Sequence, residues 1–389
     1  TPWTSSWSIS ARNEISKQIS ESKKSKKSPT ELLKKAEKIP VKIKKIELEA
    51  DSLQEEIFSM LSQIPNIIHD SVPLGRDSSQ NIEKEKIGIP AKFDFKPKNH
   101  VELGEALKIL DFDSSAKTSG SGFYYMKGDL ALLDQALIRF TIEKVTSKKF
   151  EYIETPLMLK ESIIKNVADL NDLKNQIYKI ESEDLYLIGT SEHSLIGRFI
   201  DSILQESELP IKNTSYSMCF RKEIGSHGIE EKGIYRTHQF NKIEMVIICK
   251  PEESIKYFEE TKNITIDIFK SLKIPIRVLD ICSGDLGDLK HKQVDIEAWS
   301  PIKKEYYEVG SCSNLTDAQA RRLKIRAIGK NGEKFIPHTL NNTAIATSRA
   351  LIAIMENYQQ KDGSIRIPDV LVQYMNGIKR IEKQYELKK

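Results

Sequence analysis

The sequence has little cysteine, and the few cysteines follow no metal-binding pattern. Its 389 residues include four cysteines, Cys219, Cys249, Cys282 and Cys312, and none of them lies in CxxC spacing. The seven histidines contain no HExxH motif. These absences argue against a structural or catalytic zinc site, so no zinc is expected. They predict reduced, mostly buried thiols and a cytoplasmic protein.

The sequence also lacks long apolar runs and a complete phosphate loop. No run of about 18 apolar residues is present, so no membrane span is expected. The turn IGKNGEK at 328–334 lacks the spacing of a P-loop. Hydrophobic residues make up 39% and charged residues 30%, which is typical of a globular chain of this length with two or three domains. The net charge of +4 says little about partners.

The N-terminal region carries most of the local charge asymmetry. Residues 17–45 hold eleven lysines and three glutamates, with Lys23, Lys24, Lys26 and Lys27 clustered before Pro29. A heptad of apolar residues follows, from Leu32 to Ile64. This spacing predicts a helix over 31–64, about 50 Å long, with Pro40 kinking it rather than ending it. Together with a shorter helix over 8–25, it predicts an antiparallel helical hairpin, a coiled-coil arm with a basic tip.

Two interpretations of this arm stay open on the residues alone. A projecting basic arm suits contact with a nucleic-acid backbone, whereas a dimerising coiled coil would leave the lysines in solvent. The two helices are unequal in length, so the base of the long helix has no local partner for its apolar seam.

The rest of the chain predicts an α+β body. Residues 66–105 are rich in Pro, Asp, Asn and Ser and are interpreted as a linker. We expect helices near 130–145, at 253–272 and at 344–359, packed on one side of an antiparallel sheet. The expected strands are FEYIETPLM, DLYLIGT, SYSMCF, KIEMVIIC, QVDIEAWS and EYYEVGSCS. The domains are therefore an arm at 1–65, a linker at 66–105 and an α+β body at 106–389.

One stretch, FRKEIGSHGIEEKGIYRTHQF at 220–240, concentrates charge between two strand-like runs. Alternation would place Arg221 and Glu223 on one face of the first strand, and Arg236, His238 and Phe240 on one face of the second. If the hairpin closes, these groups face one pocket. Guanidinium groups suit phosphate and carboxylate, and a phenyl ring can stack on a nucleobase. The alternative is a surface hairpin with cross-strand ion pairs.

Several motifs in order resemble the class II aminoacyl-tRNA synthetases, in the form of the seryl-tRNA synthetases. FRxE followed by RxHQF resembles motif 2, FEYIETP at 150–156 resembles motif 1, and TAIATSRALIAIMENYQQKDGSIRIPDVL resembles motif 3. GTSE at 189–192 and EVGSCSN at 308–314 look like the serine-binding and ATP-binding loops. The basic hairpin resembles the family's tRNA-binding arm, and AEKIPVKI at 36–43 has an archaeal look.

The resemblance implies a homodimeric ligase that converts L-serine and ATP to seryl-adenylate and then transfers serine to the 3′ end of tRNA(Ser), releasing AMP and pyrophosphate. It assigns catalysis to Arg221, Arg349 and Glu308. It implies that Mg²⁺ is held with ATP by Glu308 and Ser311, and that Lys23, Lys24, Lys26 and Lys27 contact tRNA. The implied ATP-binding residues are Arg221, Lys222, Glu223, Arg236, Thr237, Phe240, Glu308, Val309, Gly310, Ser311 and Arg349. The implied serine-binding residues are Thr190, Ser191, Glu192, Arg221, Glu244, Asn341 and Thr343.

The sequence departs from the family in two places. Asn342 stands where the family usually has glycine, and we expect a turn there that asparagine tolerates. The first arm helix is short. Two competing functions remain: a synthetase-like enzyme that loads a carrier protein, and a catalytically silent paralogue. Carrier-loading relatives lack the long basic arm. A silent paralogue predicts loss of Arg221, Glu223, Glu308 or Arg349, and all four are present.

Overall fold

The computed structural model describes residues 13–22, 24–25, 28–61, 63–168, 176–223 and 233–383. The chain divides into two compact units, Thr1–Ile64 and Pro65–Lys389, and each is described by itself. Within the described ranges, no helix has both the length and the apolar character needed to cross a bilayer. All four cysteines are free and buried.

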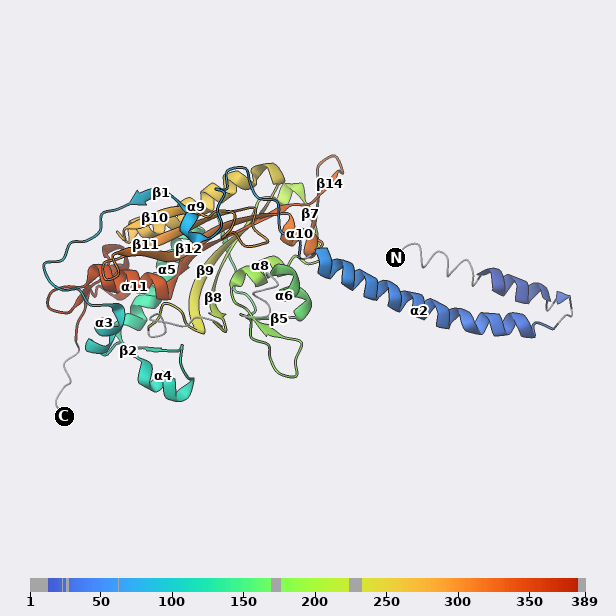
Figure 1. Cartoon of the computed structure of the whole chain (residues 1–389), viewed down its shortest axis with the longest axis horizontal. Helices are drawn as coiled ribbons and strands as arrows, with labels where there is room; N and C mark the ends of the chain where they lie inside the picture. Colours follow the sequence, from blue (N-terminus) through green and yellow to red (C-terminus); the bar gives the residue numbers. More distant parts are fainter. Residues whose placement is uncertain are drawn as a thin grey trace. The chain divides into compact units, whose positions relative to one another are not determined.

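The first unit is helical, as the heptad predicts. Residues 13–22 form one helix, and α2 (Thr30–Leu61) forms the second (Figure 1). Pro40 lies inside α2, and the helix continues through it. Lys24 is exposed, whereas Lys23, Lys26 and Lys27 lie outside the described residues, as do positions 8–12 of the expected first helix.

The apolar seam of α2 changes character along its length. From Leu32 to Ala50 the seam residues are half-buried. Further on, Leu53, Ile57 and Met60 are 57%, 56% and 60% exposed. The base of the helix therefore has little apolar cover within the described part of its unit, as the unequal helix lengths predict.

The second unit is built on an eight-stranded sheet with the order β1-β10-β11-β12-β15-β9-β8-β4 (Figure 1). All neighbouring pairs are antiparallel except β4 and β8, which are parallel. The strands are β1 (Ile82–Ile87), β4 (Glu151–Tyr152), β8 (Ile211–Phe220), β9 (Gln239–Cys249), β10 (Ile276–Asp280), β11 (Lys292–Ser300), β12 (Glu305–Thr316) and β15 (His338–Ala346). The 66–105 segment thus contributes the edge strand β1 to this sheet.

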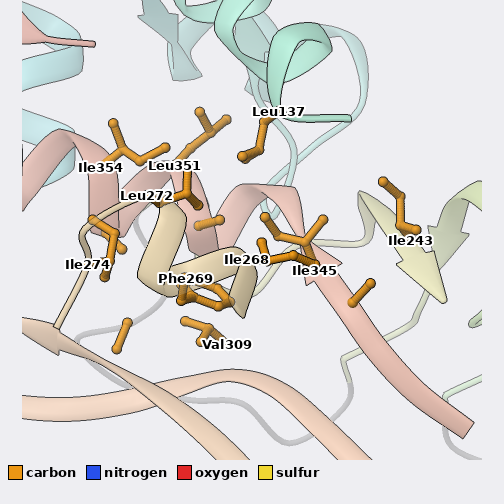
Figure 2. Packing of buried hydrophobic residues seen from close by; sticks show 14 of the residues in the cluster. Leu137, Ile243, Ile268, Phe269, Leu272, Ile274, Val309, Ile345, Leu351 and Ile354 are labelled. Atoms are coloured by element: carbon orange, nitrogen blue, oxygen red, sulfur yellow. The ribbon is translucent and has the colours of Figure 1, made fainter. Parts of the chain in front are cut away.

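Three long helices cover one face of the sheet. They are α5 (Asp129–Thr146), α9 (Ser254–Ser271) and α11 (Thr347–Tyr358). Figure 2 shows Leu137 of α5, Phe269 of α9 and Leu351 of α11 converging in the main core. These helices fall close to the expected ranges because their apolar residues recur at helical spacing.

A smaller core lies on the opposite face, so the expectation of helices on one side only is wrong. Side chains alternate along β9: Ile243, Met245 and Ile247 join the main core, whereas Val246 and Ile248 pack with Leu195 and Leu323. The central strand is buried on both faces. The short helices are α3 (His100–Ala106), α4 (Phe112–Thr118), α6 (Glu161–Val167), α8 (Ser191–Gly197) and α10 (Ala318–Arg322).

The remaining strands form small sheets outside the main one. They are β2 (Leu110–Asp111) with β3 (Tyr125–Met126), β5 (Met158–Leu159) with β6 (Tyr186–Leu187), β7 (Ile203–Gln205) with β13 (Arg326–Ile328) and β14 (Lys334–Phe335), and β16 (Ile365–Arg366) with β17 (Arg380–Ile381). The expected DLYLIGT strand is β6, so it pairs in a small sheet and not in the main one.

Two further expectations fail around motif 3. Residues 344–346 end strand β15, and the helix begins only at Thr347, because pairing with β9 overrides a locally helical pattern. Asn342 lies within β15 and not in a turn. Its buried amide nitrogen donates to the Thr261 carbonyl at 2.6 Å and to Thr265 Oγ1 at 2.9 Å.

Candidate active site

Two adjoining cavities lie on the sheet face that carries the smaller core. One has a volume of about 530 Å³ and the other of about 250 Å³. The residues that line both are Gln176, Arg221, Lys242, Glu308 and Thr343. The two spaces therefore meet along a common wall.

A buried carboxylate, Glu244 of β9, lies beneath the larger cavity and is fully paired. Lys242 Nζ lies 2.7 Å from Glu244 Oε2, and both side chains are buried. Asn341 Nδ2 donates to Glu244 Oε1 at 2.9 Å, and Thr343 Oγ1 donates to Oε2 at 3.3 Å. The strand register brings these groups together, because Thr343 lies directly opposite Glu244.

A second carboxylate, Glu192, enters the same cavity from the start of α8. Thr190 is the N-cap of this helix, and its Oγ1 accepts from the Glu192 backbone nitrogen at 3.3 Å. Gln319 Nε2 donates to Glu192 Oε1 at 2.8 Å. Burial, together with the negative charge of Glu244, raises the pKa of Glu192 to about 7. A cation placed between these carboxylates would be stabilised by both.

Arg221 lies where the two cavities join, just beyond the end of β8. Its Nε donates to the Gly189 carbonyl at 3.2 Å, and its guanidinium carbon lies 5.4 Å from the centre of the Phe240 ring. Its backbone nitrogen donates to the His238 carbonyl at 2.9 Å. The guanidinium is thus fixed between a backbone carbonyl and an aromatic face.

The smaller cavity contains a carboxylate–guanidinium pair. Arg349 Nη1 lies 3.1 Å from Glu308 Oε1. The guanidinium carbon is 4.7 Å from the centre of the Tyr235 ring, and Tyr307 donates its hydroxyl to the Arg349 carbonyl at 3.2 Å. Burial disfavours the charge on Glu308, but the charge and hydrogen bond of Arg349 act together with the charges of Arg221 and Lys290, and the net effect lowers the pKa of Glu308.

Glu223 and Arg236 face each other in the smaller cavity, although strand alternation does not place them there. Arg236 Nη1 lies 3.4 Å from Glu223 Oε2. Both residues lie outside β8 and β9, and Glu223 has a φ of +46°. Its backbone nitrogen donates to Gln176 Oε1 at 3.1 Å. The expected strand geometry is therefore wrong here, because β8 ends at Phe220 and the chain turns.

Comparisons with known proteins agree with this geometry. Residues 177–358 match the tRNA synthetase class II core domain (G, H, P, S and T), and residues 9–68 match the seryl-tRNA synthetase N-terminal domain. The chain is 45% identical to the serine–tRNA ligase of Methanoregula boonei over 94% of this chain and 86% of that protein. The chain belongs to the seryl-tRNA synthetase family.

Solved structures of the family support the same assignment. The seryl-tRNA synthetase from Pyrococcus horikoshii, complexed with ATP, is 40% identical with a TM-score of 0.85, over 98% of this chain and 90% of that one. The cytoplasmic serine–tRNA ligase from Naegleria fowleri, in complex with AMP, is 35% identical with a TM-score of 0.81, over 97% and 89%. The fold is the class II synthetase fold, and the activity is that of a serine–tRNA ligase.

The cavities gather most of the residues that the family resemblance assigns. The larger is lined by Thr190, Glu192, Arg221, Glu308, Ser311, Asn341 and Thr343. The smaller is lined by Arg221, Glu223, Arg236, Thr237, Phe240, Glu308, Val309, Gly310, Thr343 and Arg349.

Three residues of motif 2 and the GTSE loop point elsewhere. Ser191 is buried and donates to the Ser215 carbonyl at 3.3 Å. Lys222 Nζ lies 5.9 Å from the centre of the Tyr178 ring. His238 Nδ1 donates to the Arg221 carbonyl at 3.0 Å, so its ring supports the arginine backbone and does not share a cavity face with Phe240.

Several residues of the cavities were not predicted from the sequence. Gln176, Tyr235, Lys242 and Lys290 line the walls, and Gln319 supports Glu192 from behind. The spacing of Lys242 and Glu244 on one strand face was a usable signal. The two glutamines gave none, because their partners are distant in sequence.

The described residues contain no cluster of three or more His, Cys, Asp or Glu side chains suited to a metal. Glu308 lines both cavities and offers a carboxylate, and Ser311 lines the larger one and offers a hydroxyl. Such hard donors suit Mg²⁺ when a polyphosphate supplies the other oxygens.

Proposed function

We propose that the larger cavity binds L-serine, the smaller one binds ATP, and seryl-adenylate forms at their junction. The observation that carries this proposal is the position of Arg221, which lines both cavities. A guanidinium there can contact the serine carboxylate and the α-phosphate together and stabilise charge that develops in the transition state. Attack by a serine carboxylate oxygen on the α-phosphorus then releases pyrophosphate.

On the serine side, Glu192 binds the ammonium or accepts from the hydroxyl, and Glu244 beneath the cavity adds negative charge and holds Asn341 and Thr343 by hydrogen bonds. Thr190, Asn341 and Thr343 form the rest of the polar wall. The buried Ser191 supports this wall by donating its hydroxyl to the Ser215 carbonyl. A pocket built to bind a hydroxyl rejects alanine, because its polar groups would be left unpaired.

On the ATP side, the residues that line the smaller cavity bind the nucleotide. Glu223 accepts from the adenine amino group, and Phe240 stacks on the ring. Arg236 and Arg349 hold the outer phosphates. The remaining nucleotide contacts in this cavity are Thr237, Val309 and Gly310, and Ser311 reaches the phosphates from the larger cavity.

Glu308 and Ser311 would hold Mg²⁺ together with the nucleotide phosphates. The ion would supply charge neutralisation at the phosphates. Glu308 pairs with Arg349 through Oε1, so its Oε2 is the oxygen that it would offer to the ion.

The N-terminal unit acts as the tRNA-binding arm. Its basic tip, with Lys23, Lys24, Lys26 and Lys27, contacts the phosphate backbone of tRNA(Ser). We propose the domain limits 1–65 for the arm, 66–105 for the linker and 106–389 for the catalytic domain.

The protein works as a homodimer in the cytoplasm. Motif 1 contains β4, the edge strand of the large sheet, and Leu132 of α5 and Met158 of β5 are 50% and 46% exposed. An uncovered edge flanked by apolar side chains favours a second copy. Free, buried cysteines suit a reducing compartment.

The deciding experiment is attachment of labelled serine to a serine tRNA transcript by this chain, with ATP and Mg²⁺. Charging supports substrate, reaction and arm together. Serine-dependent ATP–pyrophosphate exchange without charging would support the proposed roles of the two cavities and contradict the proposed role of the arm in tRNA binding. Loss of both activities would favour a silent paralogue, and loading of a carrier protein instead would favour the alternative enzyme.

A further inference from the structure

Gln319 of α10 links three elements behind the larger cavity. The residue is 1% exposed. Its Nε2 donates to Glu192 Oε1 at 2.8 Å and to the Val167 carbonyl at 3.1 Å. Its Oε1 accepts from Thr339 Oγ1 at 2.8 Å. Thr339 is itself fully buried, so every polar atom of the Gln319 amide is used inside the protein.

The orientation of this amide is fixed by chemistry. A backbone carbonyl can only accept, so the side of Gln319 that faces Val167 must be the NH₂ group. A flipped amide would place its oxygen against the Val167 carbonyl and the Glu192 carboxylate at once, and leave two acceptors unpaired. Gln319 therefore always presents an N–H to Glu192.

We propose that Gln319 is a positioning residue for the amino-acid pocket: it holds the Glu192 carboxylate ionised and turned so that Oε2 is left for the substrate. The proposal rests on the proposed role of Glu192 in binding serine. A hydrogen bond to the charged form of a carboxyl favours that form. A carboxylate held by one oxygen also loses less rotamer freedom when a ligand binds the other.

The other groups around Glu192 define what Gln319 must offset. Glu244 of β9 opposes ionisation of Glu192, whereas Lys242 of the same strand and Lys290 favour it. The neighbouring His193 is buried and uncharged at neutral pH, because burial lowers its pKa to about 3. The other charged side chains of the same cavity are Arg221, Asp288 and Glu308. Gln319 is the neutral donor in this set, and it acts on Glu192 directly.

A purely structural role makes a different prediction. Gln319 also ties α6 to β15, so its loss could loosen the fold around both cavities. That would damage ATP binding and serine binding alike and would leave the pH dependence where it is. A positioning role changes serine binding and its pH dependence alone.

The test uses the full chain with Gln319→Met and measures serine-dependent ATP–pyrophosphate exchange across pH 5.5–9. We expect the KM for serine at pH 7 to rise about tenfold, because a hydrogen bond to a charged group is lost. We expect kcat and the KM for ATP to change less than about threefold. The acidic limb of kcat/KM for serine should move up by about one pH unit.

Two controls make the outcome decisive. Gln359→Leu removes another buried glutamine, which bonds the Lys98 backbone on both sides of its amide, and should leave the serine KM and the acidic limb unchanged. Gln319→Glu keeps the shape but adds a carboxyl beside Glu192, so the limb should move up further. Gln319→Glu also replaces Gln319→Met in the test if the methionine variant does not fold.

Glu192→Gln distinguishes a failure of the proposal for Gln319 from a failure of the proposed serine pocket. If it raises the serine KM while both Gln319 variants keep wild-type serine KM and acidic limb, the proposal for Gln319 is overturned and the serine pocket stands. If Glu192→Gln itself leaves the serine KM unchanged, the proposed pocket fails first. Equal losses for serine and ATP in the folded Gln319 variants would also overturn the proposal, in favour of a structural role.

Discussion

Arg349 and Glu308 pair with each other inside the smaller cavity, with 3.1 Å between Nη1 and Oε1. The two residues come from a helix and a strand that the sequence separates widely, and each is assigned a different part of the nucleotide. The pair favours the charged form of both side chains.

Arg349→Gln should weaken ATP binding more than serine binding. The change removes a charged phosphate ligand and the partner that lowers the pKa of Glu308. We expect the KM for ATP to rise roughly tenfold to hundredfold, with the KM for serine within about threefold. Arg366→Gln is the matched control, since Arg366 also lies over an aromatic ring, Tyr358, but outside both cavities. A variant with unchanged ATP kinetics would remove Arg349 from the phosphate site.

Arg221→Ala should abolish seryl-adenylate formation and leave the dimer intact. Removing a group that stabilises transition-state charge typically costs on the order of 10²–10³ in rate. Exchange kinetics and sedimentation measure the two properties separately. The control is Arg198→Ala, which removes an exposed arginine that lies over Phe199. Normal exchange in Arg221→Ala would contradict the site.

Neutralising Lys23, Lys24, Lys26 and Lys27 to glutamine should weaken tRNA charging and spare serine activation. Each lost phosphate contact reduces the salt dependence of tRNA binding, by a slope of about 0.7–0.9 per contact. The readouts are charging and exchange at two or more salt concentrations. The control replaces four exposed lysines of the body, Lys304, Lys330, Lys334 and Lys379. An equal loss of charging and exchange would assign the arm a structural role.

Glu192→Gln should stabilise the fold at high pH. In the folded state the pKa of Glu192 is raised to about 7 from an ordinary value of 4.5. As pH rises through this window, the unfolded chain releases its proton first, so the wild-type fold loses stability. The variant has no carboxyl at this position and does not lose this stability. We expect the Tm of the variant relative to wild type to be about 2–5 °C higher at pH 8 than at pH 5.

Glu161→Gln is the matched control with the opposite sign. A hydrogen bond from Lys165 lowers the pKa of Glu161, so its ionised form favours the folded state above the ordinary pKa. The variant should be slightly less stable than wild type at pH 8, and the difference should vanish as pH falls below the lowered pKa. Thermal denaturation at several pH values checks both variants, and parallel curves would reject the assignment for Glu192.

The sequence predicted the parts of the fold that local pattern controls. Apolar spacing was enough for α2, α5 and α9. It failed at the end of β15, where residues 344–346 fit the pattern of the helix that follows and pairing with β9 extends the strand instead. The continuous apolar run MVIIC in β9 indicated a strand buried on both faces, which the expectation of helices on one side did not take into account.

The candidate site was predictable where motifs carry it, and not elsewhere. Arg221, Glu308 and Arg349 were named from motifs, and the structure brings them to one pair of cavities. Gln176 and Gln319 reach Glu223 and Glu192 across 47 and 127 residues of chain. A single neutral side chain has no spacing signal, so only tertiary structure reveals what it holds.

The wall shared by the two cavities has a thermodynamic consequence. Gln176, Arg221 and Thr343 line both cavities. A ligand that orders these side chains in one cavity therefore lowers the entropy cost of binding a ligand in the other. The coupling free energy must be the same in both directions. Whatever factor ATP contributes to the affinity for serine, serine contributes to the affinity for ATP.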